Sequence, residues 1–143
     1  MRSAQLAAVR RYHEEGMNRR DLAAVVGGMD PAVGWYSVDG AFERRWYRGL
    51  DEVSAFLAAM FDNTVRLRFH VLRLLADPDV PDTVVAEWEN EAVFADGAPY
   101  ANRGCTVFLF TPGTDRIVEV RQHFDWGPLM ARVDWRAAVG GAT

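Results

Sequence analysis

Residues 50–71 read Leu-Asp-Glu-Val-Ser-Ala-Phe-Leu-Ala-Ala-Met-Phe-Asp-Asn-Thr-Val-Arg-Leu-Arg-Phe-His-Val, and the pattern changes halfway along. As far as Phe61 the apolar side chains recur every three or four positions, which predicts an amphipathic helix over residues 50–60. From Val65 to Val71 apolar residues alternate with arginine and histidine, which predicts a half-buried strand. A helix that leads directly into such a strand indicates an α+β protein.

Helical patterns dominate the chain before this stretch. Residues 4–17 predict an amphipathic helix whose inward stripe is formed by Leu6, Val9, His13 and Met17. Asp21 is placed to cap a short second helix over residues 22–26, which Gly27-Gly28 ends. We expect a strand at residues 33–38, followed by a long polar loop that contains Arg44-Arg45.

Strand patterns dominate the chain after it. Three more long strands are predicted over residues 83–94, 102–110 and 116–124, and a short helix over residues 126–135. Helices followed by a run of antiparallel strands predict a curved sheet covered on one face by the helices. The concave side of such a sheet encloses a cone-shaped cavity of the kind that binds small molecules. We expect one domain over residues 1–143.

The amino-acid composition argues against several classes of protein. A net charge of −4 over 143 residues lacks the positive field of a nucleic-acid binder. A single cysteine, Cys105, rules out an internal disulfide, and with only three histidines a thiolate zinc site is implausible. Because the start resembles no signal peptide and no apolar run could span a membrane, we expect a cytoplasmic protein. The 5 Trp, 8 Phe and 4 Tyr exceed what a core of this size needs, which indicates a pocket.

The order of several short motifs resembles the SnoaL-like branch of the nuclear transport factor 2-like (NTF2-like) superfamily. The motifs are Asn18-x-x-Asp-Leu, Gly49-x-Asp-x-Val, Gly97-x-x-Tyr-x-Asn, Phe108-x-Phe and Arg116-Ile-Val-Glu-Val-Arg-Gln-His-Phe-Asp. This branch and its relatives include polyketide cyclases, ketosteroid isomerases and limonene-1,2-epoxide hydrolases. The resemblance implies a cone-shaped α+β barrel that forms a homodimer and works without a metal or an organic cofactor.

The catalytic residues of these relatives are only partly present. The epoxide hydrolases use a carboxylate–arginine–carboxylate relay with a tyrosine, and the resemblance carries these positions onto Glu89, Glu87, Gln122 and Tyr36. Glu89 can replace an aspartate, but Glu87 reverses the charge of the arginine and Gln122 cannot accept a proton. The isomerase pattern lacks its base, because Tyr36 stands at that position. A standard mechanism of either kind is therefore not expected.

We predict Glu89, His13 and Tyr36 as the catalytic residues. Glu87, Glu89 and Glu91 share one strand face, and if they point inward their mutual repulsion makes one of them a proton acceptor. The alternative is a row of acids outside the cavity with Trp88 inward. His13 suits acid/base catalysis because an imidazole titrates near neutrality, although a buried histidine without a chemical role fits equally well.

The remaining candidates form the walls of the expected pocket. Predicted substrate-binding residues are Trp35, Gln122, Asn102, Trp88, Thr106, Phe108 and Phe124. The hypothesis is a cofactor-independent enzyme that cyclises, isomerises or opens the epoxide of a mostly apolar, oxygenated molecule of polyketide or terpenoid type. The alternative is a non-catalytic binding or dimerisation module with the same pocket. A small molecule is the expected partner, and nucleic acid and membrane are not.

Overall fold

The structure, a computed structural model, describes residues 1–38 and 44–125. Within this part of the chain the elements are α1 (Arg2–Arg11), the π-helical turn η1 (Tyr12–Met17), α2 (Leu22–Val26), β1 (Met29–Val38), β2 (Arg44–Arg48), α3 (Gly49–Asp62), β3 (Thr64–Leu75), β4 (Thr83–Phe94), β5 (Pro99–Phe110) and β6 (Ile117–Phe124). The helix predicted over residues 126–135 lies outside the described residues. None of the described helices has the length and apolarity needed to cross a membrane.

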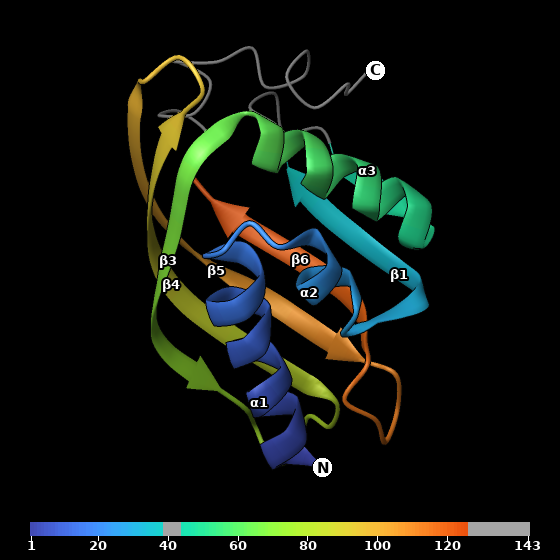
Figure 1. The fold of residues 1–143 in the computed structure, drawn as a ribbon. Helices are drawn as coiled ribbons and strands as arrows, with labels where there is room; N and C mark the ends of the chain where they lie inside the picture. Colours follow the sequence, from blue (N-terminus) through green and yellow to red (C-terminus); the bar gives the residue numbers. More distant parts are fainter. Residues whose placement is uncertain (39–43, 126–143) are drawn as a thin grey trace.

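The strands form one curved sheet in the order β2-β1-β6-β5-β4-β3. Neighbouring strands are antiparallel except for β1 and β6, which are parallel. The helices lie against the concave face of this sheet, with α3 crossing its upper end (Figure 1). The predicted α+β architecture, a sheet wrapped around N-terminal helices, is therefore confirmed.

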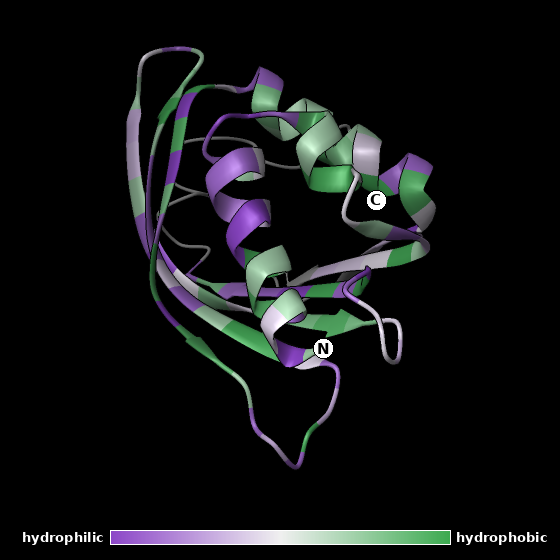
Figure 2. Ribbon diagram, turned by 60° about the horizontal axis from the view of Figure 1, so that its bottom comes forward, coloured by the Kyte–Doolittle hydropathy of each residue, from purple (hydrophilic) through white to green (hydrophobic). Residues whose placement is uncertain are grey.

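Alternation along the strands places the core between the sheet and the helices. On β4 the even-numbered residues from Val84 to Phe94 are buried, and the odd-numbered ones are more exposed. Most of α3 is hydrophobic in Figure 2, and its buried stripe faces the sheet. The members of that stripe are those expected from the sequence, Val53, Phe56, Leu57, Met60 and Phe61. The predicted cap is also present, because Asp21 Oδ1 accepts a hydrogen bond of 3.1 Å from Ala24 N.

The structure corrects three expectations about the elements. The first helix is not a single α-helix over residues 4–17, because its last turn winds as the π-helical η1. The first strand begins at Met29 instead of residue 33, since Met29 already pairs with Ile117 at the start of β6. Residues 44–48 form the strand β2 instead of a loop, because they pair with the end of β1.

Val65 was expected to be buried, and its side chain is 56% exposed. The pairing of β3 with β4 shifts between Thr64 and Arg66. An irregularity of this kind changes which side chain faces the core. Thr64 is accordingly buried at the start of the strand, and Leu67 and Phe69 follow on the inner face as predicted.

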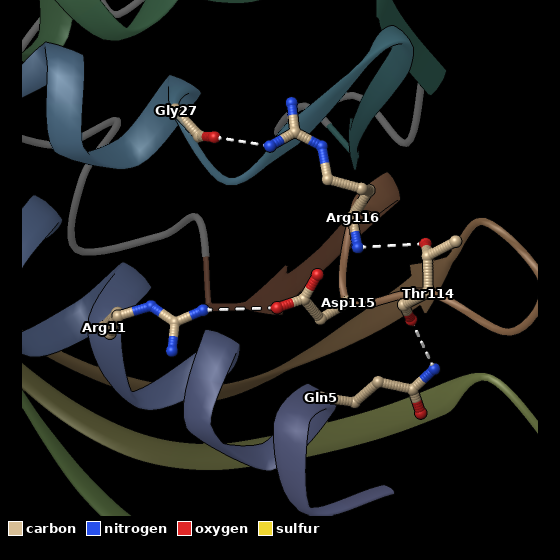
Figure 3. A network of polar contacts seen from close by, with 6 residues as sticks. All are labelled: Gln5, Arg11, Gly27, Thr114, Asp115 and Arg116. Carbon is tan, nitrogen blue, oxygen red and sulfur yellow. Dashed lines mark hydrogen bonds and ion pairs between the residues drawn. The ribbon is translucent and has the colours of Figure 1, made fainter. Parts of the chain in front are cut away.

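Polar contacts tie α1 and Gly27, the residue after α2, to the turn between β5 and β6 (Figure 3). Gln5 Nε2 donates a hydrogen bond of 2.8 Å to the Thr114 carbonyl, and Arg11 forms an ion pair of 3.6 Å with Asp115. The Arg116 guanidinium donates to the carbonyls of Gly27 and Met29. These contacts fix the N-terminal helix and the start of β1 to the β5–β6 turn.

Candidate functional site

A cavity opens between α3 and the inner face of the sheet. The space open to the centre of a water-sized sphere is about 50 Å³, and all space between the lining atoms, including the mouth, is about 600 Å³. Its lining residues come from β1, α3, β3, β4, β5 and β6: Trp35, Phe56, Met60, Thr64, Leu67, Phe69, Trp88, Asn90, Ala92, Phe94, Tyr100, Gln122 and Phe124. The predicted cavity on the concave side is present.

Aromatic rings form most of the cavity wall and hold one another in place. The Trp88 ring lies edge-on to Phe69 at 4.9 Å between centroids and 6.4 Å from Phe124. On the opposite side, Trp35 packs against Phe56 of α3 at 5.4 Å. Rings in such contacts are rigid and apolar, so this part of the cavity suits the flat body of an apolar molecule.

A chain of hydrogen bonds orients Gln122 at one end of the aromatic wall. The indole N–H of Trp88 donates a bond of 2.9 Å to Thr106 Oγ1. Because the indole only donates, the hydroxyl hydrogen of Thr106 is left for Gln122 Oε1, which lies 3.4 Å away. The amide oxygen of Gln122 is thereby engaged, and its Nε2 group is presented as a hydrogen-bond donor.

A second polar group, the Tyr100 hydroxyl, stands at the rim. Asn102 Nδ2 donates to the Tyr100 oxygen and also to the Asp125 carbonyl. The Tyr100 oxygen therefore accepts from the protein, and its own hydrogen is available for a ligand. Burial raises the pKa of Tyr100 and the nearby Asp125 charge adds to this, although the hydrogen bond from Asn102 opposes both. The phenol stays protonated at neutral pH.

Asn90 is the third polar group in the lining. The residue is 7% exposed, and its Oδ1 atom is buried without a hydrogen-bond partner. Thr64 is the fourth, and its hydroxyl donates to the backbone carbonyls of Met60 and Phe61. Gln122, Tyr100 and Asn90 thus offer hydrogen-bonding groups around a mostly apolar space.

His13 lies behind the wall. Its ring packs against Phe69 and Phe108 at 5.6 and 5.7 Å, and its Nδ1 donates a hydrogen bond of 3.0 Å to the Val9 carbonyl. Burial lowers the pKa of His13 to about 4, against the smaller opposing effect of the Val9 carbonyl. The imidazole is neutral at pH 7 and does not line the cavity.

The structure brings together four of the seven predicted substrate-binding residues. Trp35, Trp88, Gln122 and Phe124 line the cavity. Thr106 lies directly behind and orients Gln122. Two others lie elsewhere: Asn102 stands outside the lining, beside Tyr100, and Phe108 is fully buried in the core against Tyr12 and His13.

The expected inward orientation of Glu89 is wrong. Glu89 is exposed on the outer face of the sheet, where it lies 3.9 Å from Arg103. Its neighbours Trp88 and Asn90 point inward instead, because the apolar side chains of β4 also occupy the even-numbered positions, and burying them turns that face toward the core. A carboxylate outside the sheet cannot reach a ligand in the cavity, so Glu89 is not proposed as a catalytic residue.

Tyr36 also does not line the cavity. On β1, Val33 and Trp35 face the core, and Tyr36 packs on the other face against Trp46 at 5.0 Å and His123 at 6.1 Å. The strand β6 follows expectation, with Gln122 and Phe124 inward. Two of its outer side chains form an ion pair along the strand, where Arg121 donates to Glu119 at 2.9 Å.

Sequence reasoning missed Asn90 and Tyr100. The alternation along each strand would have placed both residues on the inner face. Asn90 is two positions from Trp88 on β4, and Tyr100 is an even number of positions from Thr106 on β5. Phe69, which is not among the predicted substrate-binding residues, also lines the cavity. In the part of the chain that the structure describes, no group of histidine, cysteine and carboxylate side chains is arranged to hold a metal ion.

Comparison with known proteins agrees with this architecture. Residues 9–120 match the family of SnoaL-like domains. None of the curated proteins matches the chain in sequence. An NTF2-like protein of unknown function from Burkholderia pseudomallei is 22% identical with a TM-score of 0.78, over 92% of this chain and 98% of its own.

Two further solved structures share the fold. A presumed SnoaL-like polyketide cyclase from Jannaschia sp. is 18% identical with a TM-score of 0.75, over 90% of each chain. A phenazine biosynthesis-related protein from Pseudomonas aeruginosa is 12% identical with a TM-score of 0.76, over 99% of this chain and 84% of its own. At such identities the likeness shows the fold, and the family rests on the match over residues 9–120. The chain therefore belongs to the family of SnoaL-like domains.

Proposed function

We propose that the protein is a small-molecule enzyme that binds a mostly apolar, oxygenated substrate in the cavity and polarises one substrate oxygen through the Tyr100 hydroxyl. One observation carries the proposal: the Tyr100 oxygen accepts from Asn102, which leaves its hydrogen for a ligand. Cyclisation, isomerisation and epoxide opening all develop negative charge on a substrate oxygen. A positioned neutral phenol stabilises that charge.

The surroundings of Tyr100 support this role. Asn102 is itself fixed, because its Oδ1 accepts from Arg103 N at 2.8 Å and its Nδ2 also donates to Asp125. Its amide therefore acts as a positioning group for the phenol. The rings of Trp88 and Phe124 offer an apolar surface to the rest of the substrate.

Replacing Tyr100 with phenylalanine removes the donor and keeps the ring. We expect kcat/KM to fall on the order of 10²–10⁴-fold, the usual contribution of one positioned acid. The assay is turnover of a panel of epoxides and polyketide-like ketones by the purified protein. The matched control is Tyr36→Phe on the outer face, which is expected to retain full turnover. Equal losses in both variants would contradict the role of Tyr100.

A non-catalytic binding protein is the second candidate. Its support is that the described lining residues include no carboxylate and no imidazole, so none of them is a base of ordinary strength. This candidate predicts that compounds of the same panel bind, as seen by quenching of tryptophan fluorescence, and that none is converted. Turnover that depends on Tyr100 excludes it.

We also propose that two copies pair through the outer face of the sheet, which is how we interpret the homodimer that the resemblance implies. Leu75, Val85 and Val107 stand in register across β3, β4 and β5 on that face, and Leu75 is 53% exposed. Sedimentation velocity should give the mass of a dimer for the native chain and of a monomer for Val107→Arg. A native monomer would contradict this pairing.

A further inference from the structure

Two buried side-chain oxygens of the described residues lack a hydrogen-bond partner, and they lie in different surroundings. The Tyr12 hydroxyl is inside the core, where its ring contacts Phe108 and His13. Asn90 Oδ1 belongs to a residue that lines the cavity. A buried acceptor without a donor lowers the stability of a fold, so an unpaired one in a cavity wall points to a partner supplied by a ligand.

The two residues in register with Asn90 do not supply that donor. Asn90 pairs with Phe69 on one side and with Asn102 on the other. Phe69 has no polar hydrogen on its side chain. Asn102 has two amide hydrogens, and it donates both, one to the Tyr100 oxygen and one to the Asp125 carbonyl. Each in-register neighbour of Asn90 is therefore excluded as its partner.

The register also fixes where Asn90 lies relative to the aromatic wall. Trp88, Gly104 and Phe124 form one row across β4, β5 and β6. The next row of inward-facing residues toward Tyr100 contains Asn90 and Asn102. The next inward-facing row in the opposite direction along the strands contains Thr106 and Gln122. A ligand whose apolar body lies along this aromatic row therefore meets an acceptor, Asn90 Oδ1, at one end and a donor, Gln122 Nε2, at the other.

We infer that the cavity selects ring compounds that carry a hydroxyl or N–H group, and that this group donates its hydrogen to Asn90 Oδ1. The inference rests on the proposed function, because it specifies the substrate class of the same cavity. A compound that offers only ether or carbonyl oxygens at this end leaves Asn90 Oδ1 without a donor. A hydroxylated compound satisfies this buried acceptor, so we expect donor groups to be favoured.

Three bicyclic probes of similar shape separate these cases. Naphthalene has no polar group, 2-methoxynaphthalene has only an acceptor, and 2-naphthol has a donor. Isothermal titration calorimetry of the full chain measures each dissociation constant. We expect 2-naphthol to bind about tenfold more tightly than 2-methoxynaphthalene, the usual effect of one buried hydrogen bond.

Two substitutions on the same strand show whether Asn90 makes the difference. Asn90→Leu removes the amide at similar volume, and the preference for 2-naphthol should disappear while the urea midpoint of unfolding rises. Glu89→Gln changes the adjacent residue on the outer face and should keep the tenfold preference. If Asn90→Leu does not fold, Asn90→Ala provides the same comparison of the two probes.

The outcomes separate the inference from the proposed function. A tenfold preference in the native chain that Asn90→Leu abolishes supports the inference. Equal binding of 2-naphthol and 2-methoxynaphthalene, or a preference that survives in Asn90→Leu, overturns it while leaving the cavity as a binding site. If none of the three probes binds, the proposed function itself is contradicted, and the inference fails with it. A lower urea midpoint in Asn90→Leu would show that the amide stabilises the native fold, which also overturns the inference.

Discussion

Acidification from pH 7 to pH 4 is expected to destabilise the fold by about 3 kcal/mol through His13 alone. The ordinary pKa of 6.5 applies in the unfolded chain, and burial lowers the pKa of His13 to about 4 in the folded protein. Between these two values the unfolded chain binds a proton that the folded protein does not. Protonation therefore favours unfolding, and this contribution to stability falls as the pH drops below 6.5 and levels off below about 4.

The measurement is urea-induced unfolding at a series of pH values, for the native chain and for His13→Phe. Phenylalanine suits a site surrounded by the rings of Tyr12, Phe69 and Phe108, although it gives up the hydrogen bond to Val9. The carboxylates are the same in both proteins. The difference between their curves of unfolding free energy against pH therefore isolates the contribution of His13. We expect that difference to shift in favour of the variant as the pH falls. Parallel curves between pH 6.5 and 4.5 would show that the imidazole is not held neutral by the fold.

The second large effect is expected for Gly104→Ala, which should destabilise the protein by about 3 kcal/mol, at the upper end for overpacking. A Cβ atom at Gly104 would lie 2.1 Å from the His123 carbonyl oxygen and 3.0 Å from Phe124 Cβ. The first of these is backbone of β6, so the strands must separate to make room. Because Phe124 lines the cavity, we also expect ligand affinity to fall.

Gly34→Ala is the matched control for this experiment, because Gly34 is also a strand glycine. A Cβ atom there would meet only the Trp46 side chain, at 3.4 and 3.6 Å, which is ordinary contact. We expect a change within about 1 kcal/mol, as for other strand glycines with room for a methyl group. Thermal and urea unfolding of both variants provide the comparison. Similar stabilities would show that β5 and β6 tolerate the extra atom.

Most of the fold could be predicted because it follows from local periodicity. The buried stripe of α3, the cap at Asp21 and the alternation along β4 each depend on residues close in sequence. What could not be predicted depends on distant partners. The strand β2 exists because it pairs with β1, and β1 begins at Met29 because Ile117 is beside it.

The site was predicted less well, and Glu89 shows why. On β4 five of the six even-numbered residues are apolar, so the pattern itself indicates that Trp88 faces inward. The resemblance to distant relatives indicates the opposite phase for Glu89, but the burial of the apolar side chains decides the orientation of the strand. The hydrogen bond between Asn102 and Tyr100 could not be predicted, because which amide hydrogen reaches which oxygen depends on side-chain geometry.

The parallel pairing of β1 with β6 has a consequence for how the protein forms. Trp35, near the start of the chain, has Val120 as its partner near the end. During synthesis the strand β1 can pair early with β2, but its other edge stays open until β6 has left the ribosome. Such distant pairing slows folding and leaves an unpaired strand edge exposed to other chains in the meantime. Association of incomplete chains through β1 is therefore expected to compete with folding until β6 has been made.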